Sequence, residues 1–438
     1  SAQARWIPTH PGVLRQPEEV AAAQARELPG LKGKPARRSR RGRAQLKNGI
    51  AGRVEDRVHV GNAGCPHVVA PPALLATRKR PPRAPHVRCR LIAEAGLRLI
   101  SGGRDGNLPA SPRRRAAVRA MTELLIIKPS SLGDIVHGLQ VAASLKAQVR
   151  HLRISWVVRE IFAPIVRACT AVDEVFIFER GGGAKGFLRL AKELRKRRYD
   201  WVFDFQGLLR TGLLTSRVQA DRKVGRSDAR EFSGVFYTER VPLPAEGRRS
   251  HALEILLQFC PVLGAKPELA GELEFREVES LRLSFADARG GGRPIVMFVD
   301  SRRAEKCWGG FKQLTELVLR EDRNRKVVWA GSSYVHDRNA FPPAQFANVT
   351  GNTSLVSLPA LIRRADWVIA NDSGPMHLAA AMGVRVMGVF GPTDPRLFGP
   401  YPSNRPGNVV VQAPLGDLKL LSAKDVYTRF QRARARFA

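Results

Sequence analysis

The segment from residue 370 to residue 383, Ala-Asn-Asp-Ser-Gly-Pro-Met-His-Leu-Ala-Ala-Ala-Met-Gly, constrains the fold more than any other part of the chain. The apolar residues Trp367–Ala370 predict a short buried strand. Gly374 lets the backbone come close to a ligand, and Pro375 suits the first turn of a helix. The alanine run predicts that helix, and Gly383 ends it. The segment therefore predicts a strand, a tight turn and a helix, as in an α/β domain.

The turn between this strand and this helix contains two candidate ligand-binding residues, Asp372 and Ser373. A helix that begins at the carboxyl end of a buried strand directs free N–H groups and its positive dipole end to one point, where an anion binds. We expect a diphosphate there, although an ordinary capped helix would contain the same residue types. His377 lies one turn into the helix, where a single histidine is either a structural hydrogen-bond partner or a phosphate ligand.

Apolar runs and helical stretches alternate from Met121 onward, which is the pattern of doubly wound α/β domains. Expected strands cover residues 124–128, 154–158, 174–178 and 201–205 in a first series, and 294–299, 326–330, 367–370 and 386–390 in a second. Expected helices include residues 135–147 and 187–197. We expect an α/β fold with two Rossmann-like domains, 121–285 and 294–415, that face a central cleft, followed by a C-terminal helix or tail over 416–438. The charged segment 272–293 ends in a glycine-rich stretch, so we interpret it as a linker.

Residues 1–120 differ from the rest of the chain in composition. They carry 25 Lys and Arg against 7 Asp and Glu, whereas the whole chain has 73 against 39 and a formal net charge of +34. They lack a sustained helical or strand period, so we expect a basic extension of low order. Three interpretations are open: an arm that binds nucleic acid or anionic lipid, a small domain without a recognisable pattern, or sequence upstream of a natural protein that begins at Met121. We favour the third, because the ordered pattern starts abruptly there.

The net charge is also typical of nucleic-acid-binding proteins, a class that predicts salt-sensitive binding by residues 121–438 themselves. Aromatic residues are scarce in residues 1–120, so base-stacking surfaces are not expected there. No apolar run is long enough to span a bilayer, and the five cysteines have no paired spacing. We therefore expect a protein of the reducing cytosol without a zinc site or a disulfide framework.

Residues 128–137, Lys-Pro-Ser-Ser-Leu-Gly-Asp-Ile-Val-His, follow the first expected strand as a small polar turn that leads into a helix. Asp134 lies at the carboxyl end of that strand, where its carboxylate can accept a proton from a hydroxyl group within hydrogen-bond reach. The helix dipole lowers the pKa of Asp134, so a role as base depends on positioning. The same residue type also caps helices, and both interpretations stay open. The turn is not a P-loop, because it lacks the Gly-x-x-x-x-Gly-Lys pattern.

Cationic and hydroxyl residues follow two further strands. Arg210 closes the stretch Asp204–Arg210, Asp-Phe-Gln-Gly-Leu-Leu-Arg, in which a strand ends at a glycine turn. Ser301 and Lys306 follow the first strand of the second series. They supply a hydroxyl group and a cation at the expected cleft, and both suit diphosphate oxygens.

Together these motifs resemble those of the bacterial heptosyltransferases of glycosyltransferase family 9, whose fold is GT-B. The resemblance covers residues 121 to about 415. It rests on residues 128–137, 204–210, 225–231 with the pair Arg230 and Glu231, 251–254 (His-Ala-Leu-Glu), 371–381, and 390–395 (Phe-Gly-Pro-Thr-Asp-Pro). Residues 1–120 lie outside it.

The resemblance implies metal-independent, inverting transfer of a heptose from ADP-L-glycero-D-manno-heptose to the lipopolysaccharide inner core, with no cofactor. It implies that Asp134 is the general base and that Lys306 neutralises the departing ADP diphosphate. It further implies that the donor binds Ser301, Asp337, Asp372, Ser373, Gly374 and His377, and that the acceptor binds Lys128, Arg210 and Arg230. Among these, Asp372 would hold the donor sugar and Asp337 the adenosine.

The expected partners are an ADP-sugar donor and a lipopolysaccharide core acceptor, without specific nucleic acid. The expected location is the cytoplasm, with peripheral contact to the cytoplasmic face of the inner membrane. Three alternatives stay open: a GT-B glycosyltransferase that uses another nucleotide sugar, a catalytically idle module that binds sugar nucleotides or lipopolysaccharide, and a basic nucleic-acid-binding protein. The presence of Asp134, Lys306 and Asp372 counts against the idle module.

Overall fold

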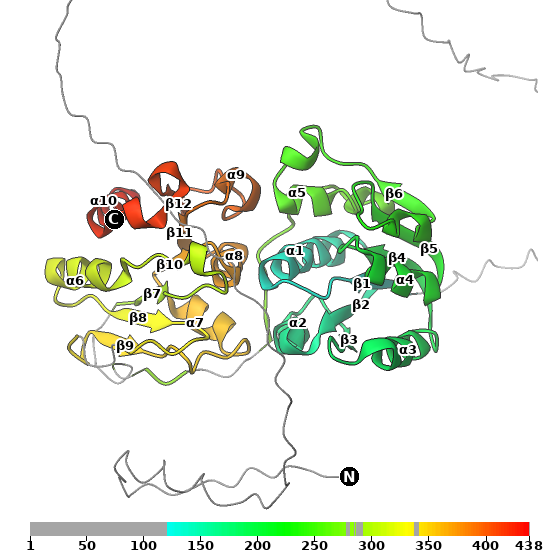
Figure 1. The fold of residues 1–438 in the computed structure, drawn as a ribbon, viewed down its shortest axis with the longest axis horizontal. Helices are drawn as coiled ribbons and strands as arrows, with labels where there is room; N and C mark the ends of the chain where they lie inside the picture. Colours follow the sequence, from blue (N-terminus) through cyan, green and yellow to red (C-terminus); the bar gives the residue numbers. More distant parts are fainter. Residues whose placement is uncertain (1–120, 277–280, 284, 286–291, 337–340, 438) are drawn as a thin grey trace, which may run out of the picture. The chain divides into compact units, whose positions relative to one another are not determined.

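The computed structural model describes residues 121–437, apart from 277–280, 284, 286–291 and 337–340. This part of the chain forms two parallel six-stranded sheets with the orders β3-β2-β1-β4-β5-β6 and β12-β11-β10-β7-β8-β9 (Figure 1). Each sheet has the Rossmann order 3-2-1-4-5-6 when its strands are counted within that sheet. The predicted pair of Rossmann-like sheets is therefore confirmed. The prediction for residues 1–120 lies outside the described residues.

The first half of the structure contains the first sheet and its helices. The strands are β1 (Thr122–Ile127), β2 (Leu152–Arg159), β3 (Glu174–Phe178), β4 (Arg198–Asp204), β5 (Gln219–Arg226) and β6 (Glu239–Val241). The α-helices are α1 (Leu132–Gln148), α2 (Ala163–Ala168), α3 (Gly183–Leu194), α4 (Leu209–Arg217) and α5 (Ala252–Leu257). Short 3-10 helices are η2 (Glu160–Phe162), η3 (Ser233–Phe236), η4 (Gly247–Arg249) and η5 (Cys260–Leu263).

The second half contains the second sheet. Its strands are β7 (Ile295–Phe298), β8 (Val327–Ala330), β9 (Phe346–Asn348), β10 (Trp367–Asn371), β11 (Arg385–Phe390) and β12 (Asn408–Gln412). The α-helices are α6 (Phe311–Glu321), α7 (Leu358–Arg364), α8 (Gly374–Ala381), α9 (Pro395–Phe398) and α10 (Ala423–Arg434). The 3-10 helices are η6 (Ala304–Lys306), η7 (Pro414–Gly416) and η8 (Leu418–Leu420).

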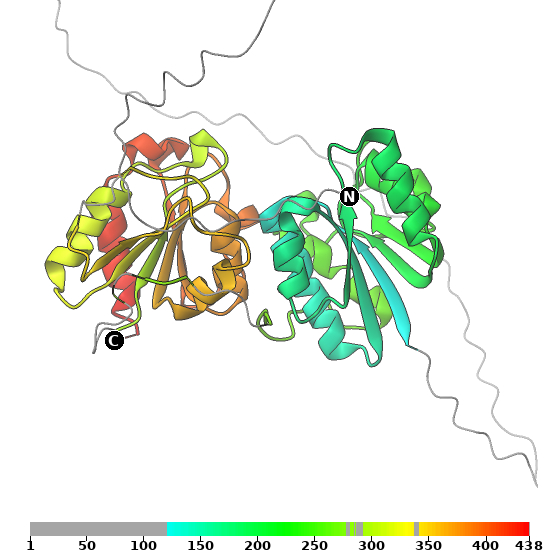
Figure 2. The ribbon, with the colours of Figure 1, turned by 90° about the horizontal axis from the view of Figure 1, so that it is seen from below.

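Helices cover both faces of each sheet (Figure 2). In β1, Leu124 and Ile126 pack with α1, α2 and α5, whereas Leu125 and Ile127 pack with α3 and α4. Successive side chains of a strand point to opposite faces, so a strand covered on both faces is apolar throughout. In the second half, α6 and α10 cover one face of the sheet and α7 and α8 the other. The apolar cluster that contains Leu124 also contains Met376 of α8, so one cluster links the two halves.

The structure contains four strands that the sequence pattern does not predict, β5, β6, β9 and β12. Strand β5 reads Gln-Ala-Asp-Arg-Lys-Val-Gly-Arg, in which three of the eight residues are exposed, so it has no apolar run. The other three are the edge strands β6, β9 and β12, each five residues or shorter. The predicted linker also differs. Within residues 272–293, the side chains of Leu273, Phe275, Leu283 and Phe285 are buried, so its described residues pack against the domain cores.

Sheet topology determines where the polar strand ends meet. The winding reverses between the neighbours β1 and β4 in the first sheet, and between β7 and β10 in the second. At such a switch point the two loops diverge and leave a crevice at the carboxyl ends of the strands, where ligands bind. Lys128 follows β1, Asp300 follows β7, and Asp372 follows β10. Across the described ranges, no helix combines the length and apolarity that a membrane crossing requires.

Candidate active site

A cavity of about 380 Å³ lies between the N-terminal turn of α1 and the strand ends of the second sheet. The first half contributes residues 131–133 and Phe162 to its wall. The second half contributes, among others, Ser301, Lys306, Asp372, Ser373 and Gly374. Five residues predicted to bind the donor are therefore brought together in one cavity, opposite the turn that carries Asp134.

The central ion pair of this cavity joins Lys306 to Asp372, with Nζ 2.5 Å from Oδ2. The side chains of Lys306 and Asp372 are 17% and 5% exposed. The neighbouring Asn371 holds the loop that carries Lys306 next to Asp372. Its Oδ1 accepts the Trp308 N–H at 3.0 Å, and its Nδ2 donates to the Asp300 carbonyl at 3.3 Å. The loop after β7 and the turn after β10 are thus joined by one amide. The Lys306 ammonium has three donors, so it can bind an anion and keep Asp372.

The N-terminus of α8 forms the anion-binding wall that the sequence predicts. Ser373 is the N-cap residue in an extended conformation, and the first N–H groups of a helix have no intrahelical acceptor. The Ser373 hydroxyl oxygen is buried and has no hydrogen-bond partner within the described residues. Such a group is costly unless a ligand satisfies it. Gly374 packs against the other half, since a Cβ atom there would lie 2.5 Å from Leu132.

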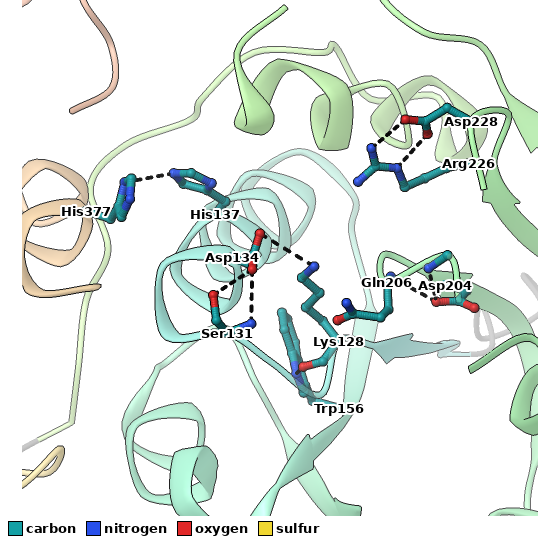
Figure 3. Close-up of polar contacts among 11 residues, drawn as sticks. Lys128, Ser131, Asp134, His137, Trp156, Asp204, Gln206, Arg226, Asp228 and His377 are labelled. Atoms are coloured by element: carbon teal, nitrogen blue, oxygen red, sulfur yellow. Dashed lines mark hydrogen bonds and ion pairs between the residues drawn. The ribbon is translucent and has the colours of Figure 1, made fainter. Parts of the chain in front are cut away.

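Asp134 lies in the first turn of α1, with a side chain that is 44% exposed. Its Oδ2 accepts the Ser131 N–H at 3.0 Å and the Ser131 hydroxyl at 2.7 Å, so the residue does cap the helix. Its Oδ1 lies 3.7 Å from Lys128 Nζ (Figure 3). Desolvation raises the pKa of Asp134, but the Lys128 ammonium and the Ser131 hydrogen bonds outweigh it and hold that pKa below its ordinary value. The carboxylate is ionised at neutral pH and is a weak base.

A second polar layer lies beside Asp134, and Lys128 is the only residue described in it that was predicted for the site (Figure 3). Lys128 is 4% exposed, and burial lowers its pKa. Gln206 follows β4, and its Oε1 is buried without a partner among the described residues. Arg226 at the end of β5 forms two hydrogen bonds with Asp228, at 2.8 and 2.9 Å. Lys128 and Gln206 are therefore available to a polar ligand that reaches Asp134 from the first half.

Three buried histidines connect the two halves beside the cavity. His137 Nε2 of α1 lies 3.2 Å from His377 Nδ1 of α8, and the two rings are nearly perpendicular, with an interplanar angle of 81° (Figure 3). The ring of His251 lies 5.4 Å from that of His137, and its Nε2 donates to the Gly399 carbonyl at 3.1 Å. Burial lowers the pKa of all three, that of His377 to about 4. The cluster is therefore neutral at pH 7, and His377 has a structural partner.

Two residues that were predicted for the site, Arg210 and Arg230, do not line this cavity. Arg210 lines a different pocket between α3 and α4, where its guanidinium lies 5.9 Å from the centre of the Phe178 ring. Arg230 is exposed, and its backbone N–H donates to the Gly207 carbonyl at 2.9 Å. Asp337 lies outside the described residues. No cluster of three or more His, Cys, Asp or Glu side chains in the described ranges could hold a metal ion.

Comparison with known proteins identifies the family. Residues 187–424, more than half of the chain, match the model of glycosyltransferase family 9 (heptosyltransferase). The chain belongs to glycosyltransferase family 9. The predicted enzyme class is thereby confirmed. This glycosyltransferase is similar to the lipopolysaccharide core heptosyltransferase OpsX of Haemophilus influenzae, with 26% identity over 66% of this chain and 84% of that protein.

A second relative and a solved structure agree with this assignment. Lipopolysaccharide heptosyltransferase 1 of Pseudomonas aeruginosa is 30% identical over 64% of this glycosyltransferase and 81% of its own length. The structure of Escherichia coli heptosyltransferase WaaC with ADP superposes with a TM-score of 0.59 and 24% identity, over 71% of this chain and 99% of that one. The structural likeness confirms the predicted GT-B fold.

Sequence motifs alone missed several polar residues of this family 9 glycosyltransferase. The clearest is Asp300, which lines the cavity and whose Oδ2 accepts both the N–H and the hydroxyl of Ser332, at 2.8 and 2.9 Å, and the N–H of Ser333 at 2.9 Å. A signal was available, because Asp300 lies just past the end of β7, as Asp372 does past the end of β10. His137 had no comparable signal, because its partner His377 is 240 residues away.

Proposed function

We propose that this enzyme transfers a heptose from an ADP-heptose to the lipopolysaccharide core, with inversion and without a metal ion. The names of the relatives support the sugar and the acceptor, since they describe lipopolysaccharide heptosyltransferases. A solved structure of the Escherichia coli relative with ADP-2-deoxy-2-fluoro heptose supports the donor. The observation that carries the proposal is the cavity in which Lys306, Asp372 and the α8 N-terminus face the α1 turn of Asp134.

On the donor side, the diphosphate binds to Lys306, the Ser373 hydroxyl and the N–H groups at the start of α8. These groups are positive or are hydrogen-bond donors before the reaction begins. As the bond between the sugar C1 and the diphosphate breaks, negative charge grows on the leaving ADP, and preorganised donors stabilise that charge by several kcal/mol. Asp372, which is fixed by Lys306, is placed to accept hydrogen bonds from hydroxyl groups of the sugar.

On the acceptor side, Asp134 accepts the proton of the attacking hydroxyl group while that oxygen forms its bond to C1. Attack from the face opposite the diphosphate inverts the configuration at C1. Because Lys128 and Ser131 lower the pKa of Asp134, the carboxylate acts through its position and not through high basicity. Lys128 interacts with anionic groups of the acceptor. The acceptor is anchored to lipid, so the enzyme works at the cytoplasmic face of the inner membrane.

A donor screen tests this proposal. The full chain is incubated with a heptose-deficient lipopolysaccharide acceptor and with ADP-heptose, ADP-glucose or UDP-N-acetylglucosamine in turn. Release of the nucleoside diphosphate is followed, and the anomeric configuration of the product is determined by NMR. We expect turnover with ADP-heptose and an inverted product. Turnover with another nucleotide sugar alone would replace the proposed donor, and a retained configuration would exclude the single displacement.

A further inference from the structure

Four apolar side chains are exposed together on the first half of the structure, and we call them the η3 patch. Phe232 and Val235 lie at η3 and are 88% and 70% exposed, and Leu209 and Leu213 of α4 are 42% and 37% exposed. Helix α4 and η3 pack against each other, since a Cβ atom on Gly212 would lie 2.8 Å from Phe236. A contiguous exposed apolar surface on a water-soluble fold marks an interaction site.

The backbone holds the tip of the η3 patch outward. Glu231 and Phe232 both have left-handed conformations, with φ values of 55° and 59°, which are unfavourable for residues other than glycine. Ser233 anchors the turn, because it is buried and its N–H and hydroxyl donate to the Arg230 carbonyl at 3.0 and 2.7 Å. The Val235 N–H donates to the Phe232 carbonyl at 3.3 Å and closes the turn between the two exposed residues. The fold maintains an unfavourable backbone that exposes a phenyl ring.

The apolar surface continues into a pocket of about 500 Å³ between α3 and α4, which Phe178, Phe187 and Leu190 line together with Leu209 and Leu213. Its rim is basic. Arg180 and Arg210 line the pocket, and the exposed Arg230 directly precedes the two left-handed residues. The two acidic residues that line the pocket, Glu179 and Glu231, both have hydrogen-bond partners in the structure.

Arginines outnumber the acidic side chains of this rim. Glu179 pairs with Arg189 at 3.1 Å, and Glu231 accepts the Leu209 N–H at 3.1 Å. An occupant of this surface must therefore present both apolar groups and negative charge. Residues 1–120 do not meet that requirement, since they carry 25 Lys and Arg against 7 Asp and Glu. A second copy does not meet it either, because a symmetric contact would place one basic rim against the other.

We propose that the η3 patch docks on an anionic lipid bilayer, with Phe232 and Val235 inserted at the headgroup boundary and the rim arginines bound to lipid phosphates. Apolar side chains flanked by cations are the chemistry of interfacial membrane binding. The location agrees, because α4 follows β4 and η3 follows β5, at the same carboxyl edge of the sheet from which the Asp134 turn projects. The inference rests on the proposed function in one respect, which is that the acceptor is anchored to lipid.

Vesicle binding by the full chain tests the proposal. Vesicles of phosphatidylcholine alone, or with about one quarter phosphatidylglycerol, are sedimented with the parent and with the double variant Phe232→Ser/Val235→Ser. The matched control is Leu415→Ser in the second half, because Leu415 is 97% exposed and also has a positive φ, 53°. Binding is measured again at about 0.5 M NaCl, which screens electrostatic attraction of the basic residues 1–120.

We expect the parent to prefer the anionic vesicles and to retain part of its binding at high salt. At high salt, the affinity of the double variant for the anionic vesicles should be roughly 10- to 100-fold lower than that of the parent. The reason is that two apolar side chains that are partly buried at the lipid boundary contribute about one to two factors of ten. Leu415→Ser should bind the vesicles as the parent does. Phe232→Trp keeps an aromatic ring at the patch and should also bind as the parent does. Parent-like binding by the double variant would overturn the proposal. The proposal would also be overturned if the double variant bound vesicles as the parent does but had a different molecular mass in solution. The patch would then be an interface between two copies of the chain.

ADP affinity separates this inference from the proposed function. ADP should bind the parent and all variants equally, because Phe232 and Val235 lie in the half that does not bind the donor. Failure of the parent to bind ADP would count against the proposed function and would leave the vesicle result intact. If the double variant matched the parent in both ADP affinity and vesicle binding, only the proposal that the η3 patch docks on membranes would be overturned.

Discussion

The contact between α1 and α8 leads to a prediction about Gly133. A Cβ atom at this position would lie 2.7 Å from Cδ2 and 3.2 Å from Nε2 of His377. Carbon atoms in ordinary contact are about 3.5–4.0 Å apart, so the Gly133→Ala variant must move the His377 ring or α1 by about 0.8 Å. The ring has little freedom, because it is buried and its Nδ1 is hydrogen-bonded to His137.

The expected magnitudes follow from this displacement. Inside a helix, Gly→Ala by itself stabilises by about 1 kcal/mol, whereas overpacking a filled contact costs about 1–3 kcal/mol. The unfolding free energy should therefore fall by no more than about 2 kcal/mol. Activity should respond more strongly, because Asp134 adjoins Gly133 and a displacement of about 1 Å at a reacting group can cost on the order of 100-fold in rate. We expect kcat/KM to fall by roughly 10- to 100-fold.

The assay compares Gly133→Ala with Gly181→Ala, a position of the same half where an added Cβ atom meets nothing within 4 Å. Release of ADP in the presence of donor and acceptor gives kcat and KM, and thermal unfolding gives the change in stability. The control should match the parent in both. Parent-like turnover by Gly133→Ala would refute the idea that close contact between the two helices positions Asp134 against the donor.

Three further predictions concern charge. Asp134→Asn keeps the helix cap, because an amide oxygen can accept the Ser131 N–H, but the amide cannot take a proton from the acceptor. Turnover at saturating donor should therefore fall by roughly 10²- to 10⁴-fold while the affinity for ADP stays unchanged. Wild-type turnover in this variant would exclude Asp134 as the general base. Lys306→Met removes the ammonium beside the diphosphate, so ADP affinity measured by calorimetry should fall by roughly 10- to 1,000-fold, and an unchanged affinity would remove Lys306 from the donor site. Burial lowers the pKa of His377 to about 4, so between about pH 6.5 and pH 4 the folded state binds fewer protons than the unfolded state. The free energy of unfolding therefore decreases as the pH is lowered from about 6.5, the pKa in the unfolded state, to about 4, the pKa in the folded state. His377 alone should contribute about 2 kcal/mol to the stability lost between pH 7 and pH 5, and His137 and His251 add to that loss. Denaturant unfolding at the two pH values should therefore show a pH dependence that is smaller by about 2 kcal/mol in His377→Gln than in the parent.

The parts of the site that the sequence predicts are local in the chain. The strand, turn and helix around Asp372 follow from consecutive residues, since buried strands are apolar and glycine and proline mark the turn. The Asp134 turn is recognisable for the same reason. Arg226 was missed because β5 is polar, with three of its eight residues exposed, and shows no strand pattern. Gln206 lies in a glycine turn that was recognised, but no role was assigned to it.

Contacts between the halves lie beyond such reasoning. The hydrogen bond between His137 and His377 depends on how two separately patterned domains pack, and no residue spacing encodes that packing. The position of Arg210 was also not evident from the sequence. Its strand-end position predicted a place in the cleft, but α4 carries its side chain to the pocket over Phe178 instead. A strand end defines an edge of the sheet, and the following helix decides which part of that edge a side chain reaches.

The double use of Asn371 restricts how donor specificity can change in this enzyme. Asn371 directly precedes the turn that carries Asp372, and both atoms of its side-chain amide bind the loop that carries Lys306, one at Asp300 and the other at Trp308. A substitution in residues 301–308 that refits the cavity to another sugar therefore shifts the phosphate-binding turn as well. New specificity should arise through paired changes in both segments, and single substitutions in either one should lower turnover with every donor.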